Sequence, residues 1–293
     1  MTVKRYGPRA PAGAPAETAP APPQLPRASR AALARGSEAH YRDTAYYAST
    51  YADRDEDIAY YVQLAAELAG GTRSEVLEYG CGNGRILLPL GRTGRRVTGV
   101  DRCTAMLTDL RRALRDEPPA VRDRVSVRRG DMRSLRIDKR FDLVLCTFNT
   151  FLHLYERRDV ERYCQRVRAH LRRRGRFVVD VSVPDPDELV RDPGRAYRVP
   201  RFRHPTTGEV VRYAERFSYA PLTQVLTVGM EFEPRDHPQD RWDTPLTHRQ
   251  FFPQELEALL HYNGLKVVEV HGDYEPASPE PDATTLIYHC RLR

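Results

Sequence analysis

The chain has 293 residues, of which 40% are hydrophobic and 9% aromatic. This is the composition of an ordinary globular protein, which excludes a fully disordered or fibrous chain. The length allows one large domain or two small ones. No apolar stretch approaches the ~20 residues of a membrane-spanning helix, and no apolar segment typical of an export signal follows the N-terminus. We therefore expect a cytoplasmic protein without a membrane partner.

The charge balance has two interpretations. The 47 basic and 40 acidic residues give a formal net charge of +7, and all but three of the basic residues are arginines. A nucleic-acid partner would explain the excess, but a general compositional preference for arginine explains it more simply. The densest basic stretch, residues 156–176, also carries an apolar stripe, so we expect its arginines on the outer face of a helix. The stripe consists of Val160, Tyr163, Val167 and Leu171.

The cysteines and the N-terminal prolines give two further predictions. The five cysteines are scattered without Cys-x-x-Cys spacing, so they predict free thiols and no metal site. Residues 1–35 contain seven prolines among alanines and arginines. Such a segment buries too little apolar surface to offset its loss of conformational entropy, and we predict a disordered tail.

The elements that follow the tail alternate between helices and strands. A tyrosine-rich stretch from Tyr41 leads into a predicted amphipathic helix, residues 55–68, which ends at two glycines. Five short apolar runs then predict strands that are buried on both faces and joined by helices, which favours a parallel α/β sheet. The predicted strands are 75–78, 96–100, 125–127, 141–145 and 176–180, and the predicted helices are 84–92, 104–115 and 157–173.

The pattern changes after residue 192. Alternating apolar and polar residues over 209–219 and 222–233 predict an antiparallel hairpin. A helix at 253–262 and two strands at 265–270 and 284–289 complete the chain. We thus expect one α/β domain over residues 36–293, in which residues 196–235 form an inserted antiparallel β lid.

The most informative motif is the glycine-rich loop after the first strand, Glu78-Tyr79-Gly80-Cys81-Gly82-Asn83-Gly84-Arg85. Its alternating glycines let the backbone approach a ligand closely before a helix begins. A dinucleotide-binding fingerprint would need a glycine at position 85, which is Arg85. No Gly-Lys-Ser/Thr follows, which excludes a phosphate-binding Walker loop.

Acidic residues end the next two predicted strands. Asp101 ends the second strand, where an acid can accept hydrogen bonds from both hydroxyls of a ribose. Asp131 lies at the end of the third strand, in Gly130-Asp131-Met132. All three loops lie at the carboxyl edge of the sheet, where open α/β folds bind their ligands.

Residues 74–182 with these motifs resemble the class I S-adenosylmethionine-dependent methyltransferases. The resemblance implies a Rossmann-like seven-stranded sheet with helices on both faces. It also implies S-adenosylmethionine as the cofactor, with its methionine part at the glycine loop, its ribose on Asp101 and its adenine near Asp131 and the Met132 backbone. The implied cofactor-binding residues of the sheet are Glu78, Gly80, Cys81, Gly82, Gly84, Asp101, Arg102, Asp131, Met132 and Thr147.

The segment after the fourth strand narrows the substrate class. Many enzymes that methylate bases carry Asp/Asn-Pro-Pro-aromatic there, whereas this chain has Cys146-Thr147-Phe148-Asn149-Thr150-Phe151-Leu152-His153-Leu154. This segment resembles the small-molecule branch, which includes glycine and amino-sugar N-methyltransferases. In that branch an antiparallel element after the fifth strand covers the acceptor, which matches the predicted lid.

Further candidate residues follow from the same resemblance and from chemistry. Tyr46, Tyr47 and Tyr51 are candidates to cap the cofactor, because an aromatic face stabilises a sulfonium cation. Arg54 is a candidate partner for the methionine carboxylate. A hydroxyl acceptor would need a base, for which His153 and then His248 are candidates. Asn149 completes the predicted catalytic set.

We expect methyl transfer to an amine or hydroxyl of a small molecule, with the amine preferred and a role in specialised metabolism. One alternative is an RNA or protein methyltransferase that docks through the basic tail and the arginine-rich helix. An alternative of another class is a regulatory protein that binds the cofactor without catalysis. The oligomeric state stays open, with a homodimer as one option.

Overall fold

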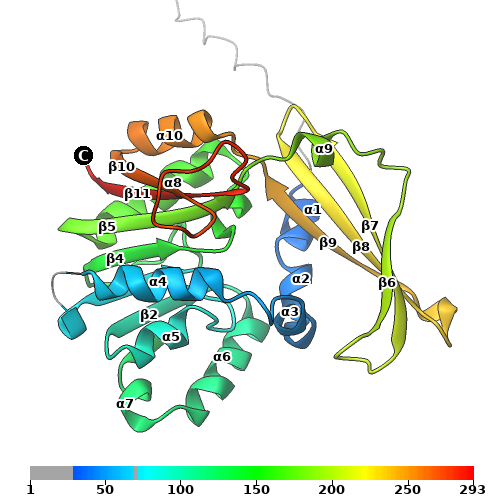
Figure 1. Ribbon diagram of the computed structural model, residues 1–293, viewed down its shortest axis with the longest axis horizontal. Helices are drawn as coiled ribbons and strands as arrows, with labels where there is room; N and C mark the ends of the chain where they lie inside the picture. Colours follow the sequence, from blue (N-terminus) through cyan, green and yellow to red (C-terminus); the bar gives the residue numbers. More distant parts are fainter. Residues whose placement is uncertain (1–28, 69–70) are drawn as a thin grey trace, which may run out of the picture.

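The computed structural model describes residues 29–68 and 71–293, so most of the predicted tail, residues 1–28, lies outside the described residues. Two β-sheets lie side by side with the short N-terminal helices between them (Figure 1). The larger sheet has the strand order β10-β11-β5-β4-β1-β2-β3, and the smaller has the order β6-β7-β8-β9.

The seven-stranded sheet confirms the predicted fold class. Strands β1 to β5 run parallel to one another. Strand β11 pairs antiparallel with β5, and β10 pairs antiparallel with β11. Four of the five residues of β1 are buried, as expected for a strand covered on both faces. The bounds are β1 Glu75–Tyr79, β2 Arg96–Asp101, β3 Val125–Arg129, β4 Phe141–Cys146, β5 Leu171–Ser182, β10 Leu265–Gly272 and β11 Thr285–Leu292.

Helices cover both faces of this sheet and form two apolar cores. Leu77 of β1 packs in one core with residues of α8 and α10, and its neighbour Val76 packs in the other with α4, α5 and α6. This division follows from the alternation of side chains along a strand. The helices are α4 Glu56–Ala66, η1 Gly71–Arg73, α5 Leu87–Arg92, α6 Thr104–Asp116, α7 Pro119–Arg122, η2 Thr150–His153, α8 Arg157–His170 and α10 Pro253–Tyr262.

Two predicted helix ends are wrong for local reasons. The helix predicted from residue 84 begins at Leu87, because Gly84 has a φ of +91°, which an α-helix does not accommodate. The helix predicted to reach residue 173 ends at His170, since Leu171 already pairs with Phe141 of β4.

The chain forms a helix within the last part of the predicted tail. Helix α1 spans Arg30–Gly36, and Ser29 caps it by accepting a hydrogen bond from the Ala32 N–H at 3.1 Å. Gly36 is buried against Thr247 of the smaller sheet. The prediction of a disordered tail is therefore wrong for residues 30–35, because a contact with a distant strand stabilises the helix and composition does not reveal such a contact. Helices α2 (Ala39–Arg42) and α3 (Thr44–Thr50) follow.

The smaller sheet contains the predicted hairpin, now β7 and β8, which pair antiparallel from Val211–Pro234 to Ala220–Val225. The sheet extends past residue 235, because β9 pairs with β8. Pro245 lies within β9, and a proline is tolerated there because β9 is an edge strand. The bounds are α9 Pro186–Leu189, β6 Tyr197–Arg203, β7 Val210–Ala220, β8 Val225–Pro234, η3 Pro238–Asp240 and β9 Trp242–Arg249.

We call this four-stranded sheet, residues 197–249, the lid sheet. Its inner apolar cluster contains Phe232 and also Tyr46 from α3, so the N-terminal helices are packed into it. Among the described residues, none of the helices has the length and apolar character needed to cross a membrane.

Candidate active site

The glycine loop begins directly at the end of β1. Gly80, Gly82 and Gly84 all have positive φ values, of 72°, 52° and 91°, which glycine adopts without strain. The Gly80 and Cys81 N–H groups both donate to the Val100 carbonyl of β2, at 2.7 and 3.1 Å, which fixes the loop across the sheet edge. A Cβ on Gly82 would meet no atom within 4 Å, so this backbone faces open space that a ligand can occupy.

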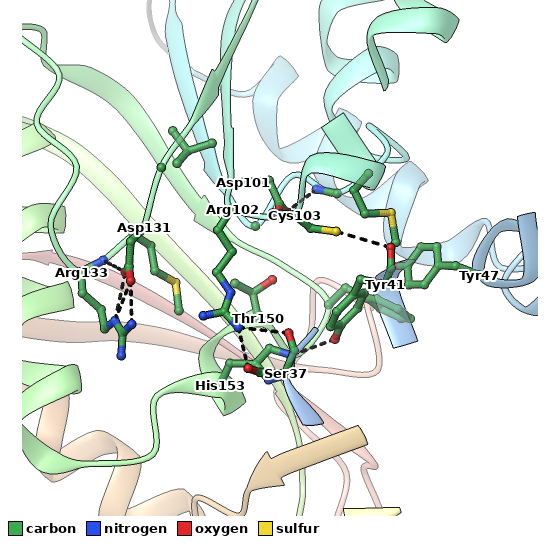
Figure 2. A pocket seen from close by; sticks show the side chains of 17 residues that line it. Ser37, Tyr41, Tyr47, Asp101, Arg102, Cys103, Asp131, Arg133, Thr150 and His153 are labelled. Carbon is green, nitrogen blue, oxygen red and sulfur yellow. Dashed lines mark hydrogen bonds and ion pairs between the residues drawn. The ribbon is translucent and has the colours of Figure 1, made fainter. Parts of the chain in front are cut away.

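A cavity opens at this edge of the sheet (Figure 2). Seven of the residues predicted for the site line it, and they come from the loops after β1, β2, β3 and β4: Gly80, Gly82, Asp101, Arg102, Asp131, Met132 and His153. The candidate Tyr47 lines it as well, and lining residues that the sequence analysis did not select include Ser37, Tyr41, Cys103, Met106 and Phe148. The predicted convergence of the strand ends is therefore present in the structure.

Asp101 lies at the centre of the cavity wall. One carboxylate oxygen accepts from the Gly82 N–H at 2.9 Å, and the other accepts from the Cys103 N–H at 2.7 Å. Burial raises the pKa of Asp101, and these backbone hydrogen bonds oppose the rise. A carboxylate has about four acceptor positions, so the side chain can still accept a hydrogen bond from a ligand such as a ribose.

Asp131 is held by a different partner. Its carboxylate forms an ion pair with Arg133 at 2.6 Å, and the same guanidinium reaches Asp159 at 2.9 Å. Arg133 also lines the cavity, although the sequence analysis did not select it. Arg133 therefore links the Asp131 loop to the first turn of α8 through charge-assisted contacts.

Glu78 is buried below the glycine loop, with an exposed fraction of 1%. Thr147 donates a hydrogen bond to one of its oxygens at 2.9 Å, while the other oxygen has no partner among the described residues. Burial raises the pKa of Glu78 to about 8. A cationic ligand beside the unpartnered oxygen would stabilise the ionised form of Glu78 and lower this pKa, which fits a sulfonium-bearing cofactor with an amino group. Glu78, Cys81, Gly84 and Thr147 support the cavity without lining it.

Of the three candidate tyrosines, Tyr47 lines the cavity, and Tyr41, which was not a candidate, lines it as well. Tyr46 instead stacks on His204 in the lid sheet, with ring centroids 5.1 Å apart. Tyr51 packs edge-on against Phe148 at 4.8 Å, outside the cavity lining. Consecutive residues of a helix point about 100° apart, so the choice between neighbours depends on which helix face meets the sheet.

Arg54 does not line the cavity either. Its guanidinium lies over the Phe148 ring, 4.9 Å from the centroid, and 3.8 Å from a carboxylate oxygen of Asp57. Asp57 also binds Arg85, at 2.7 Å. Asp57 is thus shared by two guanidinium groups, and the pairing of Arg54 with a methionine carboxylate stays a prediction.

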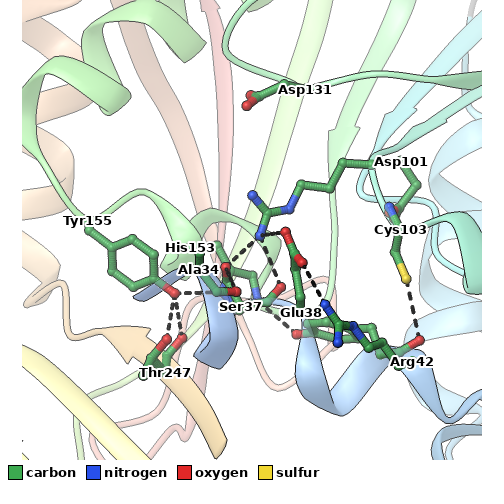
Figure 3. Close-up of polar contacts among 12 residues, drawn as sticks. Ala34, Ser37, Glu38, Arg42, Asp101, Cys103, Asp131, His153, Tyr155 and Thr247 are labelled. Carbon is green, nitrogen blue, oxygen red and sulfur yellow. Dashed lines mark hydrogen bonds and ion pairs between the residues drawn. The ribbon is translucent and has the colours of Figure 1, made fainter. Parts of the chain in front are cut away.

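Three histidines gather beside the cavity, and Figure 3 shows His153 among its polar contacts. The Nε2 of His153 lies 2.7 Å from the Tyr41 hydroxyl, and its Nδ1 lies 3.3 Å from the Tyr155 hydroxyl. The His248 ring lies 5.0 Å from the His153 ring. His40 of α2 is also buried, and the sequence analysis missed it because nothing in its local sequence marks it.

These three imidazoles are uncharged near neutral pH. Burial lowers the pKa of both His40 and His248 to about 4. Burial also lowers the pKa of His153 well below its usual range, and the neighbouring His248 lowers it further. The His40 Nδ1 and the His248 Nε2 have no hydrogen-bond partner among the described residues. Of the three, His153 is the one that lines the cavity, while the unpartnered nitrogens of His40 and His248 are buried behind it.

Asn149 has a structural position instead of the expected catalytic one. Its side-chain amide donates to the Ser182 hydroxyl at 2.8 Å, and its carbonyl oxygen accepts from the Ser182 N–H at 2.7 Å. Its φ of 62° is a left-handed conformation that asparagine tolerates better than most residues. Asn149 thus joins η2 to the end of β5, and it does not line the cavity.

Comparison with known proteins identifies methyltransferases as relatives of this chain. A family model described as a methyltransferase domain matches residues 76–175. A cypemycin N-terminal methyltransferase from a Streptomyces species is 30% identical over 203 residues, which are 68% of this chain and 75% of that protein.

Two solved structures share the fold. The CcbJ methyltransferase from Streptomyces caelestis has a TM-score of 0.69 and 23% identity, with 88% of this chain and 97% of that chain covered. An S-adenosylmethionine-dependent methyltransferase from Clostridium acetobutylicum ATCC 824 has a TM-score of 0.68 and 19% identity, with 84% and 97% covered. With its glycine loop, its acidic strand ends and these matches, the chain belongs to the class I S-adenosylmethionine-dependent methyltransferases.

Proposed function

We propose that this methyltransferase transfers a methyl group to an amine of a small molecule of specialised metabolism. The observation that carries the proposal is the cluster of uncharged histidines beside the cavity, formed by His40, His153 and His248. The name of the relative at 30% identity, an N-terminal methyltransferase of cypemycin, supports an amine acceptor and a natural-product context.

The cofactor is S-adenosylmethionine, which supplies an electrophilic methyl group on a sulfonium sulfur. We assign its ribose to Asp101, which lines the cavity, and its adenine to Asp131 and the Met132 backbone. We assign its methionine part to Gly80 and Gly82, above the unpartnered oxygen of Glu78. Tyr47 and Phe148 supply aromatic faces for the sulfonium cation.

The chemistry that the chain itself must supply concerns the proton of the acceptor. An amine attacks the methyl group through its lone pair, so an ammonium ion must first lose a proton. A neutral imidazole can accept that proton, whereas a charged one cannot. The lowered pKa values of His153 and its neighbours keep these rings neutral, and His153 is the one that lines the cavity.

The lid sheet supports the same function. The His248 ring of β9 lies 5.0 Å from the ring of His153, which lines the cavity, while Ser37, Tyr41 and Tyr47 of the N-terminal segment line it directly. We propose that the lid sheet holds this segment over the cavity as a cover. Such a cover excludes water and aligns the acceptor nitrogen, the methyl carbon and the sulfur for in-line displacement.

The test uses the purified chain with S-adenosylmethionine labelled in its methyl group. The candidate acceptors are amino sugars and short peptides with free N-termini. Each is compared with an analogue that carries a hydroxyl in place of the amine. Total RNA is tested as a further acceptor. We expect label in amine compounds only, with the methyl group on nitrogen by mass spectrometry. The Asp101→Ala variant serves as the inactive control. Label in the hydroxyl analogues or in RNA, without label in any amine, would refute the proposal.

A further inference from the structure

A second, wider groove adjoins the cofactor cavity. It runs between helix α1, the loop after β3 and helix α8, and it shares five wall residues with the cavity: Ser37, Arg102, Asp131, Arg133 and His153. Figure 3 shows this shared wall, with His153 and Ser37 between Asp131 on one side and Thr247 of the lid sheet on the other. A molecule in the groove therefore lies next to the methyl-transfer site.

The groove carries an excess of positive charge. Six arginines line it, against the three acids Asp131, Glu156 and Asp159. Two of the arginines already have carboxylate partners, because Arg133 binds Asp131 and Asp159, and Arg102 lies 3.4 Å from Glu38.

The other four arginines of the groove are Arg30, Arg136, Arg162 and Arg166. None of them forms an ion pair with a residue in the described part of the chain. Elsewhere on the surface arginines do find partners, for example Arg157 with Glu161 on α8 and Arg212 with Glu233 on the lid sheet. Arginines without a carboxylate partner among the described residues also occur outside the groove, for example Arg158 and Arg173, but the groove brings four of them together beside the cofactor cavity.

The placement of two of these arginines is unfavourable without a ligand. Arg162 and Arg166 are four residues apart on α8 and both line the groove, so they present like charges on one helix face. Like charges at this spacing repel and destabilise a helix. An anion between them would remove the repulsion, and guanidinium groups bind phosphate and carboxylate in a bidentate manner.

We propose that this groove binds an anionic group of the methyl acceptor, a phosphate or carboxylate, while the acceptor amine reaches the cofactor cavity across the shared wall. The inference rests on the proposed function, because it describes a second part of the same acceptor. It explains why the arginines of α1, α8 and the loop after β3 converge beside the active site.

The test measures anion binding by titration calorimetry, with pyrophosphate and citrate as probes, on the full chain saturated with S-adenosylhomocysteine. The groove variant is Arg162→Gln/Arg166→Gln. The control variant is Arg158→Gln/Arg173→Gln, which removes two charges from exposed positions outside the groove. We expect at least tenfold weaker anion binding in the groove variant, and binding within twofold of wild type in the control.

The two probes distinguish the anion sources, since preferential binding of pyrophosphate indicates a phosphate and preferential binding of citrate a carboxylate. Absence of binding by both probes, or equal loss in both variants, would overturn the proposal. Retained affinity for S-adenosylhomocysteine shows that the groove variant is folded.

Competition links the groove to the acceptor. With an amine acceptor identified by the labelling assay, the bound anion raises the acceptor KM and leaves kcat unchanged. An unchanged KM would overturn the assignment to the acceptor. Because calorimetry needs no turnover, a failure of the groove proposal is separate from a failure of amine methylation.

Discussion

The two sheets of the molecule build the active site in different ways. The seven-stranded sheet contributes backbone groups and short side chains from consecutive strand ends, such as Gly82 and Asp101, which are already hydrogen-bonded to each other. The lid sheet lies next to the site through His248 of its edge strand, whose ring is 5.0 Å from the ring of His153. The first arrangement is local and rigid, while the second depends on how the two sheets are held together.

The N-terminal helices hold the two sheets together, because they contact both the lid sheet and the larger sheet. Tyr46 of α3 packs in the lid-sheet cluster, while its neighbour Tyr47 lines the cavity of the larger sheet. Gly36 of α1 lies against Thr247 of β9. This difference suggests that cofactor binding belongs to the larger sheet and acceptor turnover to the contact between the sheets, and each prediction below tests that division.

The largest effect is expected from Phe232→Ala in the lid sheet. Phe232 is 1% exposed and stacks on Trp242 with ring centroids 5.1 Å apart. Removing a buried phenyl ring destabilises a core by about 3–5 kcal/mol. Urea unfolding will show this loss, while calorimetry will show an affinity for S-adenosylhomocysteine within about twofold of wild type if the division holds.

The control for this variant is Leu222→Ala, which truncates a lid-sheet residue that is 59% exposed. We expect a change in unfolding free energy within about 0.5 kcal/mol. Equal loss of cofactor affinity and of stability in Phe232→Ala would show that the two sheets form a single energetic unit.

The second prediction concerns the pH dependence of stability from Glu78. Unfolded, this carboxyl ionises near its usual value of 4.5, whereas in the fold its pKa is raised to about 8 by burial. Between these pH values the folded state keeps a proton that the unfolded state releases, so the free energy of unfolding falls as the pH rises. A shift of this size corresponds to a loss on the order of a few kcal/mol.

Glu78→Gln has no such proton and tests the prediction directly. Its unfolding free energy relative to wild type will rise from pH 5 to pH 8 in urea denaturation without cofactor. Glu257→Gln, at an exposed position on α10, is the control and will follow wild type. A constant difference between Glu78→Gln and wild type across this range would contradict the raised pKa.

The third prediction tests the larger sheet as the cofactor platform. Asp101→Ala removes the acceptor of the Gly82 and Cys103 N–H groups and the proposed ribose contacts. Hydrogen bonds to a charged group contribute about 1.5–3 kcal/mol, so we expect about a 100-fold higher Kd for S-adenosylhomocysteine by calorimetry. Asp138→Ala, exposed in the loop before β4, is the matched control. An unchanged Kd in Asp101→Ala would refute its assigned role.

The same division explains what the sequence could predict. The strands of the larger sheet appear as short apolar runs, and the glycine loop, Asp101 and Asp131 each follow one of these runs directly. Parallel strands bring their carboxyl ends to one edge, so local motifs were enough to predict where these residues meet.

The parts that the sequence did not predict depend on contacts between distant segments. Tyr41 binds His153, which is 112 residues away, and nothing near Tyr41 distinguishes it from Tyr46. Strand β9 has a proline and few apolar residues, so only its pairing with β8 defines it. Asn149 was chosen for its side-chain amide, yet that amide is hydrogen-bonded to Ser182, 33 residues away in the sequence.

The smallest effect is expected at the contact between the sheets, from His153→Asn. Asparagine keeps a polar side chain but accepts no proton, so methyl transfer to an amine at pH 7 should fall by about tenfold, toward the low end for loss of a general base. The loss should appear in kcat. The loss in kcat should shrink as the pH rises past the pKa of the acceptor amine, because the amine then loses its proton to the solvent.

His261→Asn, at an exposed position on α10, is the control and should keep wild-type rates at every pH. A hydroxyl acceptor remains protonated throughout this range and would give a loss that persists at high pH. A pH-independent defect in His153→Asn would therefore contradict the amine as the acceptor, while leaving the cofactor site on the larger sheet unaffected.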